Sequence, residues 1–481
     1  MRKIVHIIAL LIMTSAWVSL SGCRSEEFDR YIPDILKPDS IQDDTIVRDS
    51  TTIDTTIVDT VVVDTVVTDS VPGASDDNAG DVTSGDGTYS VLSRKNYTLA
   101  GVRKTFANTM MAGGEENAMM DNIMNWLNRN VSKDTVMTMV AIKYPTLDAQ
   151  GKKVMASGVL YLPSNTKNIK EILIASHYTI THVKNSPSQE SGMMMEALIS
   201  ASNPGTAVFA SDYIGFGITA DMVHPYLVEA NAGQCQLDVA RAGMEYLKDN
   251  SYTMDKALKT YSVGFSQGGA VAVATQRAFE EDATAVDDFN FCGTYCGDGP
   301  YDPWATFEYY FEQGKAELPT VLPMTLMGMM SAYPDVFQGI EFKEYFSKKI
   351  DTAKLYNMIA SKEYDIMTID SAIKQMAGSN RLSDIMSQAA LDTSSSINKA
   401  LRIALDRNNL ADGSWTPKHV CVVYHARNDN VVPYVNSRSL KSAFPSDKFV
   451  DATPALRSNQ HAVAAISYYM SMIMQNKYRV K

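Results

Sequence analysis

Segments with strand and helix patterns alternate along the chain from Val136 onward, and this alternation restricts the possible folds more than any other feature. Two strand-like segments flank a polar turn and predict a β-hairpin, VMTMVAIKYPT and VMASGVLYLP. Short buried strands are predicted at EILIASHY, TAVFASDY, LKTYSVG, FNFCGTYCG and KHVCVVYH. Helices are predicted at SQESGMMMEALIS, NAGQCQLDVARAGMEYLKDN, GGAVAVATQRAFEE and HAVAAISYYMSMIMQ. Because parallel strands need crossover connections, the pattern predicts an α/β fold, a mostly parallel sheet with helices on both faces.

The alternation stops between residues 300 and 418. This stretch is rich in helix formers, aromatic residues and methionine and shows no clear strand pattern. We expect a helical cap insertion over the carboxyl end of the sheet, which divides the core into residues 91–299 and 419–481. Methionine adapts to irregular apolar ligands and would suit an acyl chain, but packing of helix against helix explains these methionines equally well.

The first 22 residues have the composition of a signal peptide. Arg2 and Lys3 precede a long apolar run, and small residues follow it in LSGC, which ends at Cys23. LSGC resembles the lipobox of bacterial lipoproteins, which implies that Cys23 is lipidated and anchors the protein to a membrane. The acidic RSEEFD that follows resembles export tags, so we expect an outer-membrane lipoprotein exposed at the cell surface. A secretory signal with an incidental cysteine is the alternative.

Residues 23–90 are predicted to form an acidic low-complexity tether. Aspartate recurs every five residues from Asp44 to Asp69, each time followed by Thr or Ser. A period of five matches neither the strand nor the helix, so no single face is apolar. As a coil, about 67 residues would span roughly 45 Å root-mean-square, enough to hold a domain away from a membrane.

Composition excludes several classes of protein. The 481 residues carry a net charge of −12, and no cluster of Lys and Arg indicates a nucleic-acid partner. Neither C-x-x-C nor H-x-x-x-H spacing occurs, so we predict no metal and no cofactor. Cys292 and Cys296 are a possible disulfide in an exported protein, whereas Cys235 and Cys421 lie in apolar patterns and are expected as buried thiols.

The segment YSVGFSQGGA contains the pattern G-x-S-x-G around Ser266. A predicted strand precedes the serine and a predicted helix follows it, which is the setting of a nucleophile elbow. In such a turn the serine hydroxyl is lifted above the sheet, and the backbone N–H of Gln267 faces developing negative charge. We therefore predict that Ser266 is a nucleophile and Gln267 an oxyanion donor.

A serine nucleophile needs a base and an acid, which follow it along the chain in this fold. His461 is the histidine beyond the last predicted strand, at the start of the closing helix, and we take it as the base. Asp429 lies in the loop of VVYHARNDNVVPY, directly before the His461 segment, and is the favoured acid. Asp298, in CGDGPYDP, is the rival, although it could equally shape the turn into the insertion.

Several motifs, in their order along the chain, resemble those of the α/β-hydrolases. Within that superfamily the chain is most similar to the secretory lipases and related exported esterases. The motifs are ASGVLYLP, DYIGFG, HPYL before LDVARA, GFSQGG and HARNDNVVP, spread over residues 134 to 475. The resemblance implies an eight-stranded sheet, activity on carboxylic esters, and Ser266, Asp429 and His461 as nucleophile, acid and base.

One motif departs from the family. After the third strand the family often has His-Gly-Thr, whose backbone supplies the second oxyanion N–H, whereas this chain reads His177, Tyr178 and Thr179. Thr179 is still expected as the donor by position. His177 and His182 as metal ligands are the weaker alternative, and Asp212 in SDYIGFG is expected to hold a loop.

Four functions fit these observations. We favour an esterase or lipase that acts through a Ser-His-Asp triad and an acyl-enzyme. A peptidase of the prolyl-oligopeptidase type and an esterase that removes acetyl or feruloyl groups from polysaccharides use the same chemistry. A non-catalytic binding module on a hydrolase scaffold would be expected to lack a triad residue.

Overall fold

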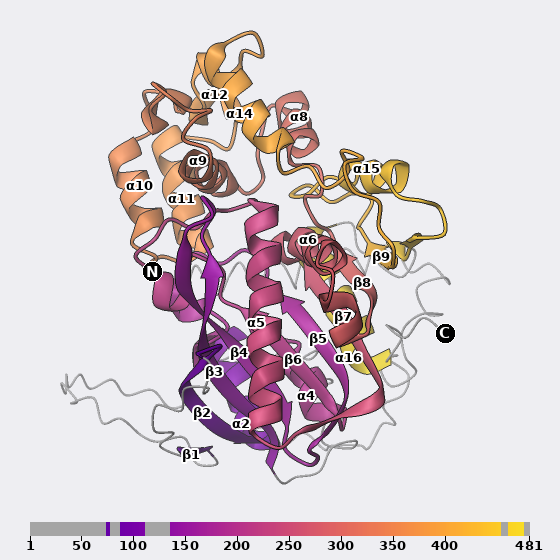
Figure 1. Ribbon diagram of the computed structural model, residues 1–481. Helices are drawn as coiled ribbons and strands as arrows, with labels where there is room; N and C mark the ends of the chain where they lie inside the picture. The colour runs from indigo at the N-terminus through magenta and orange to yellow at the C-terminus, as the bar shows by residue number, and fades with distance from the viewer. Residues whose placement is uncertain (1–73, 77–86, 111–134, 454–459, 476–481) are drawn as a thin grey trace, which may run out of the picture.

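A computed structural model describes residues 74–76, 87–110, 135–453 and 460–475 (Figure 1). The predicted signal peptide, Cys23 and most of the predicted tether lie outside the described residues. Within the described residues, no helix is both long enough and apolar enough to span a bilayer.

Ten strands form one mixed sheet, in the order β1-β2-β3-β4-β6-β5-β7-β8-β9-β10. In this order, neighbouring strands are antiparallel from β1 to β6. From β6 through β5 and β7 to β10, neighbouring strands are parallel. The strands are β1 Ala74–Asp76, β2 Ser90–Thr98, β3 Thr135–Leu147, β4 Lys153–Pro163, β5 Asn168–Ser176, β6 Thr206–Ser211, β7 Thr253–Phe265, β8 Phe291–Gly297, β9 Val420–Tyr424 and β10 Phe449–Asp451. The predicted hairpin is confirmed, since β3 and β4 pair from Met137 opposite Pro163 to Leu147 opposite Lys153.

Helices cover both faces of the sheet, as the alternating pattern predicts (Figure 1). Successive residues of β5 point to opposite faces, so Leu173 packs in one apolar cluster and Ile172 in the other. The first cluster includes side chains of α2 Leu99–Met110, α4 Ala197–Ser202 and α16 His461–Gln475. The second includes side chains of α5 Glu229–Asp249, α6 Gln267–Glu281 and α7 Ala285–Phe289. α15 Val435–Ala443 lies between β9 and β10 in the chain.

Residues 300–418 form helices at one end of the sheet, drawn in brown and orange in Figure 1. They are α8 Pro303–Gln313, α9 Val321–Ala332, α10 Thr352–Ala360, α11 Ile366–Ala377, α12 Leu382–Ile385, α13 Gln388–Leu391 and α14 Ser396–Asp406. Because α8 begins shortly after β8 ends, the helices lie at the carboxyl ends of the parallel strands. The domain boundaries themselves stay predictions.

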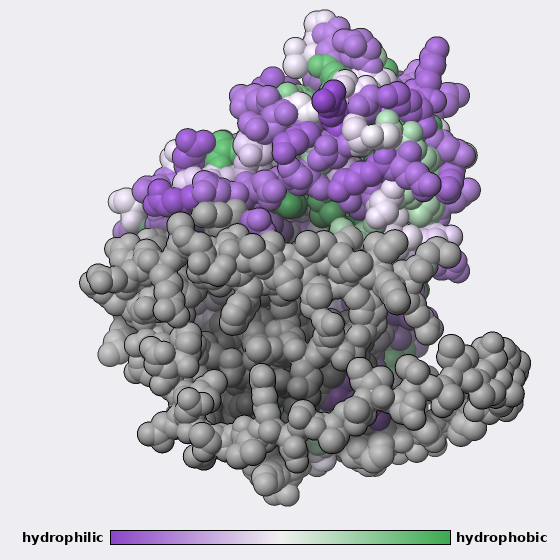
Figure 2. Space-filling view, turned by 180° about the vertical axis from the view of Figure 1, so that it is seen from behind, coloured by the Kyte–Doolittle hydropathy of each residue, from purple (hydrophilic) through white to green (hydrophobic). Residues whose placement is uncertain are grey.

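Most methionines of this helical region point inward. Met324, Met327, Met329, Met358 and Met386 are buried in a cluster that also contains Tyr226, Leu227 and Val228 of the core. The face of this region that Figure 2 shows is mostly hydrophilic. The methionines therefore pack helix against helix and against the core, and two of them also line a cavity described below.

Three expectations need correction. The sheet has ten strands and not the eight implied by the family resemblance, because β1 and β10 extend its two edges. β1 also shows that three residues of the predicted coil tether pair with β2. Of the helix predicted over SQESGMMMEALIS only η4 Glu190–Gly192 and the short α4 form, and Ser188, the first residue of the segment, bonds to Asp212 through both its backbone N–H and its hydroxyl.

The possible disulfide between Cys292 and Cys296 is absent among the described residues. Both residues lie on β8, four positions apart, which places their Cα atoms roughly 13 Å from each other. A disulfide requires a Cα separation below about 7 Å. The four described cysteines are free thiols, and Cys235 and Cys421 are buried as predicted.

Candidate active site

Ser266 lies on the turn between β7 and α6, the strand and helix that the sequence predicts around it. Its φ of 59° is positive, which is rare for a residue with a side chain. The flanking glycines leave space for this turn: a Cβ at Gly264 would lie 2.1 Å from the Gly268 carbonyl oxygen, and one at Gly268 would lie 2.0 Å from the Ser176 carbonyl oxygen. The turn therefore depends on glycine at both positions.

His461 links Ser266 to Asp429. Its Nε2 lies 2.8 Å from the Ser266 hydroxyl oxygen, and its Nδ1 lies 2.5 Å from Asp429 Oδ2. The three residues come from β7–α6, the loop after β9 and the first position of α16, so only the folded sheet brings them together. In this geometry Nδ1–H donates to the carboxylate and Nε2 is free to accept the serine proton.

The Asp429 carboxylate is held by its own loop. Its Oδ1 accepts hydrogen bonds of 2.8 Å from the backbone N–H groups of Val431 and Val432. Burial alone would raise the pKa of Asp429, but the charge and hydrogen bond of His461, together with further hydrogen bonds, lower it to about 2. Asp429 is therefore ionised at neutral pH.

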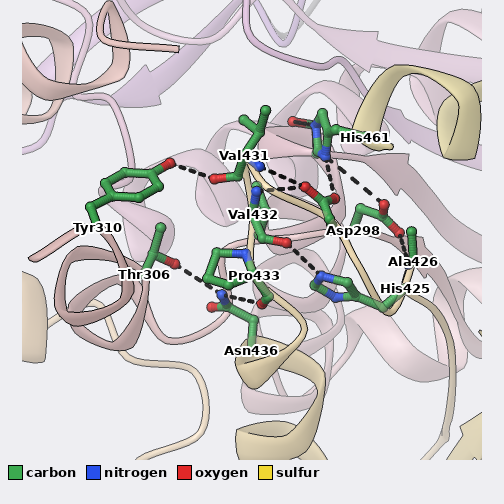
Figure 3. A network of polar contacts seen from close by, with 12 residues as sticks. Asp298, Thr306, Tyr310, His425, Ala426, Val431, Val432, Pro433, Asn436 and His461 are labelled. Atoms are coloured by element: carbon green, nitrogen blue, oxygen red, sulfur yellow. Dashed lines mark hydrogen bonds and ion pairs between the residues drawn. The ribbon is translucent and has the colours of Figure 1, made fainter. Parts of the chain in front are cut away.

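Side chains from α8, α15 and the loop itself fix this loop (Figure 3). Tyr310 donates to the Val431 carbonyl, and His425 donates through Nε2 to the Val432 carbonyl at 2.8 Å. Asn436 donates to Thr306 Oγ1 at 2.9 Å. Burial lowers the pKa of His425, so its ring is neutral and can donate through one nitrogen only. The sequence does not reveal these supporting residues, because nothing in their local patterns indicates which loop they contact.

Asp298, the rival acid, lies in the same place but makes a longer contact. Its Oδ2 is 3.9 Å from His461 Nδ1, compared with 2.5 Å for Asp429. Its Oδ1 accepts the backbone N–H of Ala426 at 3.1 Å. Burial and the nearby negative charge of Asp429 hold the pKa of Asp298 well above its ordinary value. Asp429 is therefore the carboxylate in hydrogen-bonding contact with His461, and Asp298 is a weaker acid beside it.

Asp298, His425 and Asp429 bring potential ligand atoms within 4.8 Å of one another, the one such group among the described residues. Their existing bonds already account for most of these atoms. Both oxygens of Asp429 accept hydrogen bonds, and the Nε2–H of His425 is used by Val432. We describe the group as a carboxyl pair beside a neutral histidine and assign no metal to it.

The predicted oxyanion donors lie on adjoining segments. The first turn of α6, which begins with Gln267, packs closely on the end of β5, where Gly268 meets the carbonyl oxygens of Ser176 and His177.

His177 is buried, which lowers its pKa to about 4, so its ring carries one N–H. We assign that N–H to the shorter contact, 2.7 Å from Nδ1 to the Tyr178 carbonyl. Because the peptide is trans, the N–H of Thr179 then points away from His177.

Two side chains behind these donors line a cavity of about 120 Å³ between the core and the helical region. His224 Nε2 lies 3.0 Å from Gln267 Nε2, and the Tyr226 hydroxyl lies 3.0 Å from Thr179 Oγ1. Burial lowers the pKa of His224 to about 3, so its ring is neutral. The apolar part of the lining consists mainly of Ile180, Phe216, Met324, Met327, Ile359 and Ala360. The lining does not include Ser266, His461, Gln267 or Thr179, but His224 and Tyr226 connect it to the side chains of Gln267 and Thr179, and the cavity can take an apolar group.

The remaining predictions near the site concern His182, Tyr178 and Asp212. His182 does not converge with His177, because its ring caps η3 Val183–Asn185 by accepting the Lys184 N–H. The Tyr178 side chain is 51% exposed and does not fill the turn. Asp212 holds a loop as predicted, since its carboxylate accepts 2.5 Å hydrogen bonds from Ser157 and Ser188.

Solved structures with a similar fold include two esterases or lipases. The rice cell wall degrading esterase LipA from Xanthomonas oryzae has a TM-score of 0.60 at 20% identity, covering 82% of this chain and 98% of its own. Lipase A from Candida antarctica in its closed state has a TM-score of 0.52 at 17% identity, covering 72% and 76%. At these identities the likeness shows the fold alone, that of the α/β-hydrolases.

No curated protein matches the chain. The sequence does match the secretory lipase family over residues 184–469, more than half of its length. This match spans the elements that carry Ser266, Asp429 and the helical region. The protein therefore belongs to the secretory lipase family and is a carboxylic ester hydrolase with the α/β-hydrolase fold.

Proposed function

We propose that Ser266, His461 and Asp429 form the catalytic triad of this ester hydrolase. The observation that carries the proposal is the continuous chain from the Ser266 hydroxyl through both ring nitrogens of His461 to Asp429, with contacts of 2.8 and 2.5 Å. Asp429 keeps the Nδ1–H tautomer, so that Nε2 can act as a base. The ionised state of Asp429 at neutral pH supports this role.

The reaction proceeds in two halves. His461 takes the proton of Ser266 while the serine oxygen attacks the ester carbonyl carbon, and the backbone N–H groups of Gln267 and Thr179 stabilise the oxyanion. The tetrahedral intermediate collapses, the C–O bond to the alcohol breaks, and His461 gives the alcohol its proton. Water then attacks the acyl-enzyme with the same proton transfers and releases the carboxylic acid and free Ser266.

We place the acyl group of the substrate in the cavity behind the oxyanion donors. Two observations support this placement. The lining is mainly apolar, and the side chains of two lining residues, His224 and Tyr226, contact the side chains of Gln267 and Thr179. The volume of about 120 Å³ favours a short or medium acyl chain unless the α8–α14 region moves.

A panel of p-nitrophenyl esters from acetate to palmitate, together with an acetylated polysaccharide and a peptide anilide, tests this function. Wild type should hydrolyse the esters, and Ser266→Ala should lower kcat by on the order of 10⁴-fold or more. Met327→Trp, which fills part of the cavity, should lower kcat/KM for octanoate at least tenfold more than for acetate. Unchanged turnover in Ser266→Ala would contradict the proposed triad. A higher kcat/KM for the peptide anilide than for the esters would favour a peptidase.

An esterase that acts on polysaccharide is the second candidate. The printed description of the Xanthomonas oryzae neighbour, a cell wall degrading esterase, is the observation that favours it. If the protein releases acetate from the acetylated polysaccharide with a higher kcat/KM than from p-nitrophenyl acetate, we would conclude that it is a polysaccharide esterase.

We also propose that the mature protein is anchored to the outer membrane through a lipid on Cys23, with the catalytic domain at the cell surface. The signal-like segment and LSGC support this location.

A further inference from the structure

The structure contains a second carboxyl group beside the proposed triad that the mechanism does not use. Asp298 is fully buried, and it directly follows β8, whereas Asp429 lies in the loop after the neighbouring β9. The two strands are parallel and pair up to Gly297 opposite Tyr424, so both loops leave the sheet at the same point. The N–H of Asp298 also donates to the Tyr424 carbonyl at 2.9 Å, which fixes the distance between the loops.

The bonding of Asp298 leaves one oxygen without a donor. Oδ1 accepts the Ala426 N–H, whereas no donor in the described part of the chain reaches Oδ2. Its neighbours are His461 Nδ1 at 3.9 Å, whose proton is used by Asp429, and the Asp429 carboxylate itself. Two carboxylates so close in a buried site would repel each other, so one proton between them is needed.

We propose that Asp298 is a positioning residue whose protonated carboxyl donates a hydrogen bond to the Asp429 carboxylate and holds it against His461. The proposal rests on the triad proposed above. An O–H···O⁻ bond is strong in a buried site, and it adds a third fixed donor to the two backbone N–H groups that already hold Asp429. It also disperses the negative charge of Asp429, which limits how strongly that charge raises the basicity of His461.

The other titratable groups that face the pair do not compete for this proton. His425 comes from the loop after β9, Tyr301 from the loop after β8, and Tyr310 from α8. Burial lowers the pKa of His425 and raises the pKa values of Tyr301 and Tyr310 above their ordinary range. These shifts favour the neutral form of all three groups, and burial together with the charge of Asp429 favours the protonated form of Asp298.

Two substitutions of Asp298 separate its role as a hydrogen-bond donor from its ability to ionise. Asparagine keeps a donor but cannot ionise, whereas glycine removes both. In Asp298→Asn the amide oxygen can still accept the Ala426 N–H and the amide N–H can still donate to Asp429, so kcat should stay within about threefold of wild type. Asp298→Gly tolerates the positive φ of 42° at this position but removes the donor. We expect it to lower kcat by roughly 10- to 100-fold and to move the acidic limb of the kcat/KM profile to higher pH.

Asp288→Asn, an exposed carboxylate on α7, is the matched control and should change neither value. Thermal midpoints are measured for all variants, and a pH profile that shifts in a folded variant separates positioning from loss of structure. If Asp298→Asn is as inactive as Asp429→Asn, Asp298 is the ionised acid and the proposal is wrong. If Asp298→Gly has the turnover and pH profile of wild type, the carboxyl has no positioning role.

A second measurement does not depend on the glycine variant. In Asp429→Ala the repulsion is gone and the His461 Nδ1–H has lost its acceptor, so the Asp298 carboxyl should accept that hydrogen bond. The single variant should then retain at least tenfold more kcat at pH 8 than Asp298→Asn combined with Asp429→Ala. Equal rates would overturn the proposal. Activity that survives Ser266→Ala would instead refute the triad, so the two failures are distinguishable.

Discussion

At the scale of single residues, backbone conformation at the site is as specific as side-chain chemistry. Ser266 has φ 59° and ψ −128°, a combination that a residue with a Cβ adopts only under strain. The sequence shows the reason in part, because glycines stand two positions away on both sides. The close approach of Gly268 to the Ser176 carbonyl oxygen depends on β5, about 90 residues earlier in the chain, and is visible only in the fold.

We predict that Ser266→Gly is more stable than Ser266→Ala by about 1 kcal/mol, although both are inactive. Glycine relieves the strain at positive φ, worth roughly 1–2 kcal/mol, and loses part of this gain through the greater freedom of the unfolded chain. Urea unfolding of the two variants measures the difference. A less stable glycine variant would show that the turn is not strained.

At the scale of elements, the α10–α11 connection is tied to the core by a buried lysine. Lys362 Nζ donates to the carbonyls of Ala220 and Met222 at 2.7 and 2.6 Å, and Thr181 donates to the Tyr364 carbonyl at 2.8 Å. Burial lowers the pKa of Lys362 to about 8. These contacts join segments about 140 to 180 residues apart, and the local sequence around Lys362 gives no sign of them.

This lysine predicts a pH dependence of stability. Between about pH 8 and 10 the folded protein has released the Lys362 proton while the unfolded chain, with an ordinary pKa near 10.4, still binds it. The free energy of unfolding of wild type relative to Lys362→Met should therefore rise with pH, by up to about 1.4 kcal/mol per pH unit.

Denaturant unfolding at several pH values between about 7 and 10 measures this slope, with Lys348→Met, an exposed lysine, as the control. A stability difference that is flat across this range would mean that Lys362 keeps its proton.

At the scale of the whole molecule, the chain combines an acidic N-terminal region with an ester hydrolase. Loss of residues 1–22 with Arg2 and Lys3 would take the net charge to −14. A coil with the length of the predicted tether would span roughly 45 Å, less where β1 pairs with β2. If Cys23 is lipidated as proposed, a coil of this length would hold the hydrolase away from the membrane surface.

We predict that Cys23→Ala moves the protein from the membrane fraction to the soluble fraction and abolishes incorporation of labelled palmitate. The physical reason is that the lipid chains supply the apolar surface that partitions into the bilayer. Protease added to intact cells should degrade the protein if it faces the cell surface and leave it intact if it faces the periplasm. Palmitate labelling that persists in Cys23→Ala would exclude this cysteine as the anchor.

The sequence by itself determined the α/β class, the parallel strands and the turn at Ser266, because each depends on local periodicity or on glycine spacing. It favoured Asp429 as the acid by its place directly before the His461 segment but left Asp298 as a rival. Both follow buried strands, and β8 and β9 prove to be parallel neighbours, so both carboxyl groups reach His461. Only the tertiary structure shows that Asp429 lies 1.4 Å closer to His461 Nδ1 than Asp298 does, since this difference depends on strand register and on side chains from distant helices.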